Sequence, residues 1–264
     1  MFEAKVSLAS YCFHKMLEEK MIDVYGYLES LKYRYQVPNA DIWNGYLKGM
    51  DTGDFRKIRR AMEERGLGLA SLCCDWANVW GGNPDDEGEF DKSAAKCLEA
   101  AEILGAKTVR FDVGVKEDDI SEEQFEKVCK KFAAYAKRGS DAGFAIGPEN
   151  HWGASRRLSV QQRLYKEINS KNYGMLLHLG NWNLEEGQTK LSCDLAAASM
   201  AVHTHVDYEH AMTISDWLAD FIKAGYKGLF GIEHHKEIYE YQGAQAQLGA
   251  VLYGLAKLEK EANK

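Results

Sequence analysis

The stretch Ala142-Gly143-Phe144-Ala145-Ile146-Gly147-Pro148-Glu149-Asn150-His151 contains one complete unit of a pattern that recurs along this chain. It begins where an amphipathic helix, predicted over Glu122–Asp141, ends, and Ala142-Gly143 suits the C-terminal cap of that helix. A short apolar strand is predicted next, over Phe144–Pro148, and polar side chains close it. The stretch therefore predicts a helix, a buried strand and a polar strand end, in that order.

The same alternation predicts eight strands in all. They are Lys5–Ser10, Ala40–Trp43, Leu67–Cys73, Thr108–Val113, Phe144–Pro148, Tyr173–Leu177, Met200–His205 and Gly228–Glu233, with helices such as Phe55–Arg65 and Lys92–Leu104 between them. Parallel strands joined by helices form either an open sheet or a closed barrel. Eight strands in 264 residues, close to the roughly 250 of a typical (β/α)₈ TIM barrel, favour the barrel. The first strand is not followed by the Gly-rich loop of a dinucleotide-binding sheet.

The composition indicates an ordinary globular protein. Three prolines and the lack of a Pro/Gly/Ser-rich linker predict one domain over residues 1–264. The net charge of −7 without a basic stripe argues against nucleic-acid binding. Membrane insertion is not expected, since no apolar run approaches roughly 20 residues. The first seven residues lack a signal-peptide layout, so we expect a cytoplasmic protein. Its cysteines show no CxxC pair and are interpreted as reduced, buried residues: Cys12, Cys73, Cys74, Cys97, Cys129 and Cys193.

Histidine and glutamate gather at the ends of the last four predicted strands. Six of the eight histidines lie in four stretches: Gly147-Pro148-Glu149-Asn150-His151-Trp152, Leu177-His178-Leu179-Gly180-Asn181, His203-Thr204-His205-Val206-Asp207 and Ile232-Glu233-His234-His235. Taken singly, such a residue is more often a hydrogen-bonded structural side chain than a ligand. In a barrel, however, these ends meet at one mouth, and carboxylates crowded with imidazoles are stabilised there by a divalent cation. The pattern predicts a metal site at the C-terminal ends of the strands.

At these residues the chain resembles the xylose isomerase-like barrel superfamily of sugar isomerases and epimerases. Glu149-Asn150-His151 matches the E-x-H motif of that superfamily, and Glu233 matches its final glutamate. In the second motif His178 replaces the usual aspartate. In the third, either His203 or His205 fits, and His203 is preferred because it follows the apolar run. The resemblance thus implies Glu149, His178, His203 and Glu233 as ligands of one ion, with Mn²⁺ favoured and Zn²⁺, Co²⁺ or Mg²⁺ as alternatives.

A narrower resemblance points to the barrel subunits of bacterial C-glycoside deglycosidases, which cleave the carbon–carbon bond between a 3-oxidised glucose and a flavonoid. Three segments carry it: Ala40 to Gly45, Cys74 to Trp80 with the following Asn83-Pro84-Asp85, and Gly147 to Gly153 (GPENHWG). This resemblance implies a sugar or glycoside substrate and allows for a small second subunit. An oligomeric protein is also expected.

The reactions of these families share one step, removal of a proton from carbon next to a carbonyl. The resemblance to epimerases implies that Glu149 and Glu233 double as bases. His151 is a candidate for a separate acid/base, and a role as a donor that orients Glu149 suits it as well. Arg110 and Asp112 are expected to pair with each other. The remaining candidates are expected to line the substrate pocket: Tyr11, His14, Trp43, Asn44, Asp75, Trp80, His205 and His235.

Three other functions compete with this hypothesis. A sugar or sugar-phosphate isomerase or epimerase would use the same step without cleaving a glycoside. A metal-free barrel that only binds carbohydrate is compatible with His178 in place of aspartate, and the deglycosidase resemblance also allows a non-catalytic subunit of a complex. Phosphodiester cleavage at abasic DNA, which the superfamily also includes, fits poorly with the acidic balance.

Overall fold

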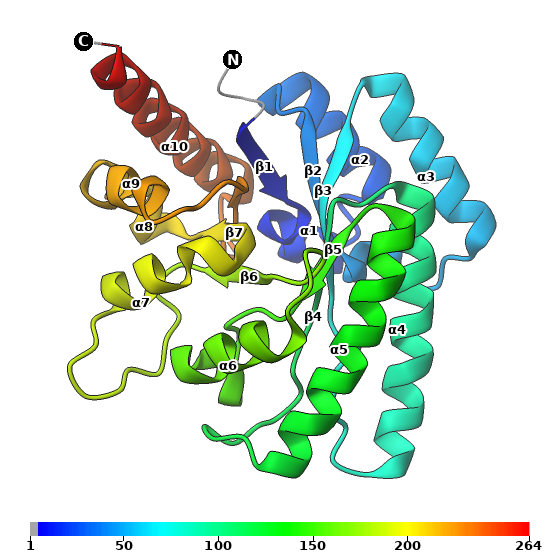
Figure 1. Cartoon of the computed structure of the whole chain (residues 1–264). Helices are drawn as coiled ribbons and strands as arrows, with labels where there is room; N and C mark the ends of the chain where they lie inside the picture. Colours follow the sequence, from blue (N-terminus) through cyan, green and yellow to red (C-terminus); the bar gives the residue numbers. More distant parts are fainter. Residues whose placement is uncertain (1–4, 264) are drawn as a thin grey trace.

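Eight parallel strands form the centre of the computed structural model, which describes residues 5–263 (Figure 1). Their bounds are β1 Val6–Ala9, β2 Asn39–Trp43, β3 Gly68–Cys74, β4 Thr108–Phe111, β5 Ala145–Gly147, β6 Met175–His178, β7 Ala201–Val206 and β8 Leu229–Ile232. The strands are hydrogen-bonded in the order β5-β4-β3-β2-β1-β8-β7-β6. This confirms the predicted (β/α)₈ barrel, and each predicted strand is present with ends shifted by a few residues.

The barrel closes between β5 and β6 through single bridges and one side chain. Backbone bridges join Ile146 to Tyr173 and Glu149 to Leu176. Nearer the mouth, Asn150 Nδ2 donates to the carbonyl of His178 at 2.8 Å, and Asn150 Oδ1 accepts from the His178 amide at 2.8 Å. The Asn150 amide therefore takes the place of a strand pair and fixes the height of His178 beside Glu149.

The helices lie outside the strands (Figure 1). Their bounds are α1 His14–Glu18, α2 Val24–Glu29, α3 Thr52–Arg65, α4 Pro84–Leu104, α5 Glu122–Ala142, α6 Leu158–Ile168, α7 Lys190–Ala197, α8 Tyr208–Met212, α9 Ile214–Lys223 and α10 Glu240–Ala262. Two begin earlier than predicted because polar caps precede the apolar pattern. Asp51 and Asp54 form a capping box for α3, and Asn83 caps α4 ahead of Pro84. The predicted cap of α5 is confirmed, with Gly143 left-handed at φ 87°.

The strand register sets which side chains meet inside the barrel. His178 of β6 is paired with His205 of β7, whereas His203 is paired with Leu176 one level lower. On β8, Gly231 faces this lower level, and a Cβ there would come within 2.8 Å of His203 Nε2 and 3.0 Å of Asp41 Oδ2. Glycine leaves the room that this buried polar layer needs.

The six cysteines are free and buried, as predicted. Within residues 5–263, no helix is both long and apolar enough to cross a membrane.

Replacing Asn150 tests the closure between β5 and β6. We expect Asn150→Ala to lower the free energy of unfolding by about 2–3 kcal/mol, because it leaves buried backbone groups of His178 without partners. Scanning calorimetry of this variant beside Lys130→Ala, a change at an exposed position of α5, measures the difference. Equal melting temperatures for the two variants would show that Asn150 does not hold the closure.

Candidate metal centre and substrate pocket

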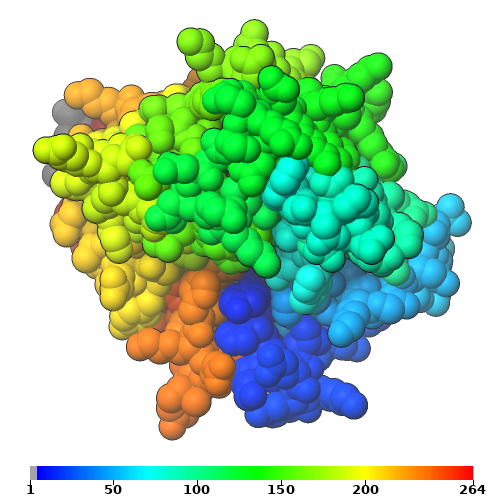
Figure 2. Space-filling view, turned by 90° about the horizontal axis from the view of Figure 1, so that it is seen from below, coloured from blue at the N-terminus to red at the C-terminus, as the bar shows by residue number. Residues whose placement is uncertain are grey.

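A cavity of about 540 Å³ lies at the C-terminal ends of the strands. Each strand or the residues just after it contribute to its lining, through Ala9, Trp43, Cys73, Arg110, Glu149, His178, His205 and Glu233. In Figure 2 the segment after β8 (orange) lies beside the segment after β1 (blue), where the rings of Tyr11 and His235 are 5.6 Å apart. The volume suits a small-molecule ligand.

Four ligand-type atoms converge on one point of this cavity. They belong to Glu149, His178, His205 and Glu233, and all lie within 4.8 Å of one another. The Nδ1 atom of His178 is 3.2 Å from Glu149 Oε1 and 3.5 Å from Glu233 Oε2. The Nδ1 atom of His205 is 3.5 Å and 3.2 Å from the same two oxygens. Atoms bound at about 2.1 Å to one ion are roughly 3.0–3.5 Å apart, so these spacings fit a single ion.

The structure brings His205 into this cluster instead of His203, which corrects the preference taken from the sequence. The Nε2 atom of His203 lies 2.8 Å from Asp41 Oδ2 and 3.4 Å from the hydroxyl of Ser7. Its ring is therefore below the cluster, inside the barrel. The Nε2 atom of His205 is 3.2 Å from the same Asp41 oxygen. Asp41 thus joins the two imidazoles beneath the four converging atoms.

The hydrogen bonding of His205 supports a cation at this point. Since a carboxylate accepts, Nε2 of His205 donates to Asp41, and Nδ1 then faces two carboxylates. This Nδ1 atom is buried without a hydrogen-bond partner among the described residues. A carboxylate that holds one imidazole nitrogen while the other points at an ion is a common arrangement in metalloproteins. The cluster therefore has the donors and the unsatisfied atom that a metal ion would fit.

The charges in the cluster are strongly coupled. Burial alone would raise the pKa of Glu149, but Arg110, His178 and His205 lower it well below its ordinary value. Burial would likewise raise the pKa of Glu233, but His205 and His235 lower it well below its ordinary value. Burial would lower the pKa of His205, whereas Glu233 and Asp41 raise it well above the ordinary value. Burial opposes ionisation of Asp41 too, yet the two histidines bring its pKa down to about 2.

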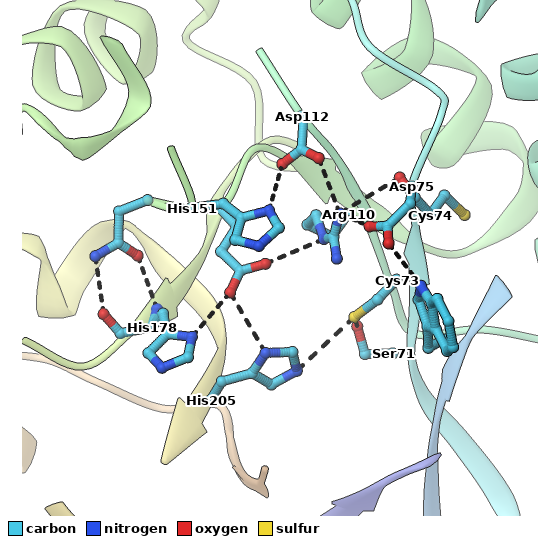
Figure 3. A network of polar contacts seen from close by, with 12 residues as sticks. Ser71, Cys73, Cys74, Asp75, Arg110, Asp112, His151, His178 and His205 are labelled. Carbon is cyan, nitrogen blue, oxygen red and sulfur yellow. Dashed lines mark hydrogen bonds and ion pairs between the residues drawn. The ribbon is translucent and has the colours of Figure 1, made fainter. Parts of the chain in front are cut away.

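Arg110 of β4 connects the cluster to a second group of acidic residues (Figure 3). Its Nη1 lies 2.8 Å from Asp75 Oδ1 and 3.2 Å from Asp112 Oδ2. Its Nε is 3.1 Å from Glu149 Oε2, an ion pair without the alignment of a hydrogen bond. The expected pairing of Arg110 with Asp112 is present, but Arg110 also contacts two further carboxylates.

His151 lies at the edge of the cavity, where Asp112 holds its ring. Its Nδ1 lies 3.2 Å from Asp112 Oδ1, and its side chain is 41% exposed. Donation from Nδ1 to the carboxylate leaves Nε2 unprotonated in the neutral ring. Among the described residues no hydrogen bond or ion pair joins His151 to Glu149, whereas Arg110 Nε lies 3.1 Å from Glu149 Oε2, so Arg110 is also a candidate for the orienting role.

The residues expected to line the pocket divide into two sets. Five of them line the cavity: Tyr11, Trp43, Asp75, His205 and His235. The ring of Tyr11 is edge-on to that of Trp43 at 5.2 Å, and Trp43 Nε1 donates to Asp75 Oδ2 at 2.7 Å. Three others are not among the lining residues: His14, Asn44 and Trp80.

Each of these three has a structural contact that explains its position. His14 stacks on Tyr11 and lies 2.8 Å from the Tyr11 carbonyl through Nδ1. Asn44 exchanges hydrogen bonds with the backbone of Asp75. The ring of Trp80 has Lys127 Nζ 5.0 Å from its centroid. His14 and Asn44 therefore support the wall of the pocket from behind.

The comparisons with known proteins agree with this architecture. The xylose isomerase-like TIM barrel family matches residues 36–250, so the chain belongs to that family. No curated protein matches its sequence.

Among solved structures, L-ribulose 3-epimerase is similar with a TM-score of 0.74 and 13% identity over 98% of this chain and 97% of that one. D-allulose 3-epimerase from Methylomonas sp. has a TM-score of 0.71 and 14% identity, covering 96% of each chain. For 3-keto-D-glucoside 4-epimerase from E. coli the TM-score is 0.67 and the identity 14%, over 90% and 94% of the two chains. At these identities the likeness is one of fold.

Replacing each histidine of β7 by alanine tests which of the two binds the metal ion. We expect His205→Ala to weaken Mn²⁺ binding at least tenfold more than His203→Ala, because only His205 directs a nitrogen at the cluster. Isothermal titration calorimetry of the metal-free proteins measures this, with His14→Ala as the control that leaves the affinity unchanged. The assignment is wrong if His203→Ala has the larger effect.

Proposed function

We propose that this protein is a metal-dependent enzyme of the sugar isomerase and epimerase type, which removes a proton from carbon next to a carbonyl. The convergence of Glu149, His178, His205 and Glu233 in the cavity is the observation that supports this most directly. A site that only bound carbohydrate would not require two carboxylates and two imidazoles around a buried, unpaired nitrogen.

Different residues of the pocket would bind the metal ion and the substrate. Glu149, His178, His205 and Glu233 would hold the ion, which when bound polarises a carbonyl and lowers the cost of removing the neighbouring proton. The rings of Tyr11 and Trp43 offer apolar faces to the C–H groups of a sugar.

Polar groups on the same side complete the pocket. Asp75 is 28% exposed and can accept from a hydroxyl. His151 is placed to transfer a proton at the cavity edge through Nε2, with Asp112 fixing its ring.

The substrate candidates are ketoses and 3-oxo-glycosides. Two similar folds are described as ketose 3-epimerases and one as an epimerase of a 3-keto-D-glucoside. In a 3-oxo-glycoside the C–H groups next to the carbonyl are as acidic as those of a ketose, so the same site suits both. Cleavage of a 3-oxo-C-glycoside, with a small second subunit, is the narrower version of the proposal that the sequence resemblance favours.

The test combines metal analysis with a substrate panel. We expect the purified protein to contain about one equivalent of a divalent transition metal. We also expect it to turn over at least one ketose or 3-oxo-glycoside, as detected by NMR. Less than about a tenth of an equivalent after Mn²⁺ soaking would support the metal-free alternative. Co-purification with a second chain tests the subunit proposal.

The two carboxylates of the cluster provide a prediction about turnover. Assayed with one equivalent of Mn²⁺, Glu149→Gln and Glu233→Gln are each expected to lower turnover more than about 100-fold. Each substitution removes a charged ligand atom from the cluster without changing the size of the side chain. Glu126→Gln, at an exposed position of α5, serves as a control for the same change of charge. Near-normal turnover in either cluster variant would contradict the assigned roles.

The charges of the lining favour an uncharged sugar over a sugar phosphate. Six carboxylates line the cavity: Asp41, Asp75, Glu149, Asp207, Glu209 and Glu233. The two permanent cations are Arg110 and Lys236. Arg110 is already surrounded by three carboxylates, and Lys236 is exposed, with its Nζ 5.3 Å from the centre of the Tyr208 ring. One divalent ion and these two cations would offset four of the six carboxylate charges.

Accordingly, a free ketose is expected to have a kcat/KM at least about tenfold above that of its phosphate ester, because the phosphate group meets like charges. Competition between the two compounds in one assay measures the ratio. A phosphate ester that is preferred would contradict this prediction.

A further inference from the structure

A second cavity, of about 220 Å³, lies between the ends of β2 and β3 and the helices α3 and α4, and it is called the side cavity below. Among residues 5–263 it shares no lining residue with the larger cavity. Asn44 stands between the two, because it lines the side cavity and exchanges hydrogen bonds of 2.9 and 3.1 Å with the backbone of Asp75, which lines the larger one. The side cavity is therefore behind the wall of the substrate pocket and has no part in the site described above.

The floor of the side cavity is apolar. Four buried side chains form it, each at most 6% exposed: Leu47, Phe55, Leu72 and Ala100. Such a surface suits an apolar body better than a sugar, because it offers hydroxyl groups few partners. The volume is below the roughly 300–1,000 Å³ of sites for drug-sized ligands, so it suits a ligand of one or two rings.

Trp76 lines this cavity in a strained conformation. Its φ of 57° lies in the left-handed region, which bulky side chains rarely adopt. The residue is 59% exposed, and within residues 5–263 its indole has no hydrogen bond and no aromatic or cationic partner. Packing within the chain therefore does not explain why a tryptophan is held there, whereas strain of this kind is common at ligand sites. A planar ring bound in the side cavity would give the indole a stacking partner.

The charge of the side cavity is opposite to that of the larger one. Its charged lining residues are Lys48 and Lys96, both exposed, and no carboxylate is among the lining residues that the structure describes. Neither lysine forms an ion pair within residues 5–263, although acidic side chains outnumber basic ones in this chain by 40 to 33. Two unpaired cations beside an apolar floor favour an anion that carries an apolar body.

We propose that the side cavity binds a small planar aromatic carboxylate. The ring lies against the apolar floor and the Trp76 indole, and the carboxylate lies near Lys48 and Lys96. An inorganic anion makes no use of the floor, and a neutral ring makes no use of the lysines. The inference does not rest on the proposed function, since it concerns other residues and is tested by binding alone.

Three probes separate the contributions of ring and charge. Isothermal titration calorimetry of the wild-type protein with 2-naphthoate is expected to give one site with a dissociation constant below about 1 mM. The neutral amide of the same shape, 2-naphthamide, is expected to bind at least about tenfold more weakly, and inorganic phosphate is expected not to compete. Equal binding of acid and amide, or displacement of 2-naphthoate by phosphate, would overturn the proposed ligand class.

Variants of the lysines locate the charge. The double variant Lys48→Met, Lys96→Met is expected to bind 2-naphthoate about tenfold more weakly and 2-naphthamide unchanged, because only the acid has a charge to lose. Lys130→Met, at an exposed position of α5 without an ion pair, is the control and leaves both affinities unchanged. The carboxylate is misplaced if the control and the double variant behave alike.

Variants of Trp76 separate binding from stability. Trp76→Gly is expected to raise the melting temperature by about 1–3 °C, because glycine adopts the left-handed conformation without strain, and to weaken 2-naphthoate binding at least about tenfold. Trp76→Phe keeps a ring and is expected to stay within about threefold of the wild-type affinity. A tryptophan with a purely structural role would lower the melting temperature when replaced by glycine, and this result would overturn its part in binding.

Filling the cavity tests the location of the site. Ala100→Leu places a larger side chain at the floor and is expected to weaken 2-naphthoate binding more than about 20-fold. Ala95→Leu, the same change at an exposed position of α4, leaves the affinity unchanged. Should Ala100→Leu fail to fold, the lysine and Trp76 variants decide.

Two results overturn the inference as a whole. One is a wild-type protein that does not bind 2-naphthoate, or a folded Ala100→Leu variant that binds it as the wild type does. The other is a Trp76 emission that changes only when a second protein chain is added, which would assign the side cavity to a protein partner.

Discussion

One carboxylate oxygen, Oδ2 of Asp41, accepts hydrogen bonds from the Nε2 atoms of His203 and His205, and the arrangement of the site depends on it. Because the Nε2 proton of His205 is committed to Asp41, its Nδ1 must face Glu149 and Glu233. A buried nitrogen lone pair between two carboxylates is unstable unless a proton or a metal ion occupies the space. The nitrogen has no aligned hydrogen bond, whereas an ion at the centre would contact four atoms at once.

The charge around the four converging atoms is less negative than the family pattern would make it. The family pattern has aspartate there, and its loss removes one negative charge from the set of ligands. Arg110, next to Glu149, lowers the negative potential further. The proposed ion would be held by two imidazoles and two carboxylates, a softer and less charged set that would suit Mn²⁺, Zn²⁺ or Co²⁺ better than Mg²⁺.

Much of the fold could be predicted from the sequence, since eight apolar runs with polar ends are a strong local signal. The first residues of α3 and α4 were harder to predict, because Asp51 and Asn83 cap these helices from outside the apolar pattern. The convergence of Glu149, His178 and Glu233 followed from the rule that parallel strand ends meet at one mouth. Their roles as ligands remain a proposal.

The choice between His203 and His205 could not be made from the sequence. The two residues lie on the same face of one strand, and only the stagger of neighbouring strands places His205 level with His178 and His203 level with Leu176. Asp41 was overlooked as a site residue because it lies within a strand instead of at its end, although it shares a face with Trp43. The partners of Arg110 come from three strand ends, so no local pattern reveals them.

The barrel separates two tasks that a sugar-processing site must perform. The ends of β5 to β8 provide the four converging ligand atoms, and the ends of β1 to β4 provide the wall of aromatic and polar groups. Arg110 and Asp41 connect the two halves, since Arg110 pairs with Glu149 of the cluster and Asp41 accepts from His205. Residues such as Tyr11 and Trp43 can therefore vary with the substrate while the cluster stays intact, whereas a change at Arg110 alters both halves together. A shared fold with epimerases of different sugars is what such a division allows.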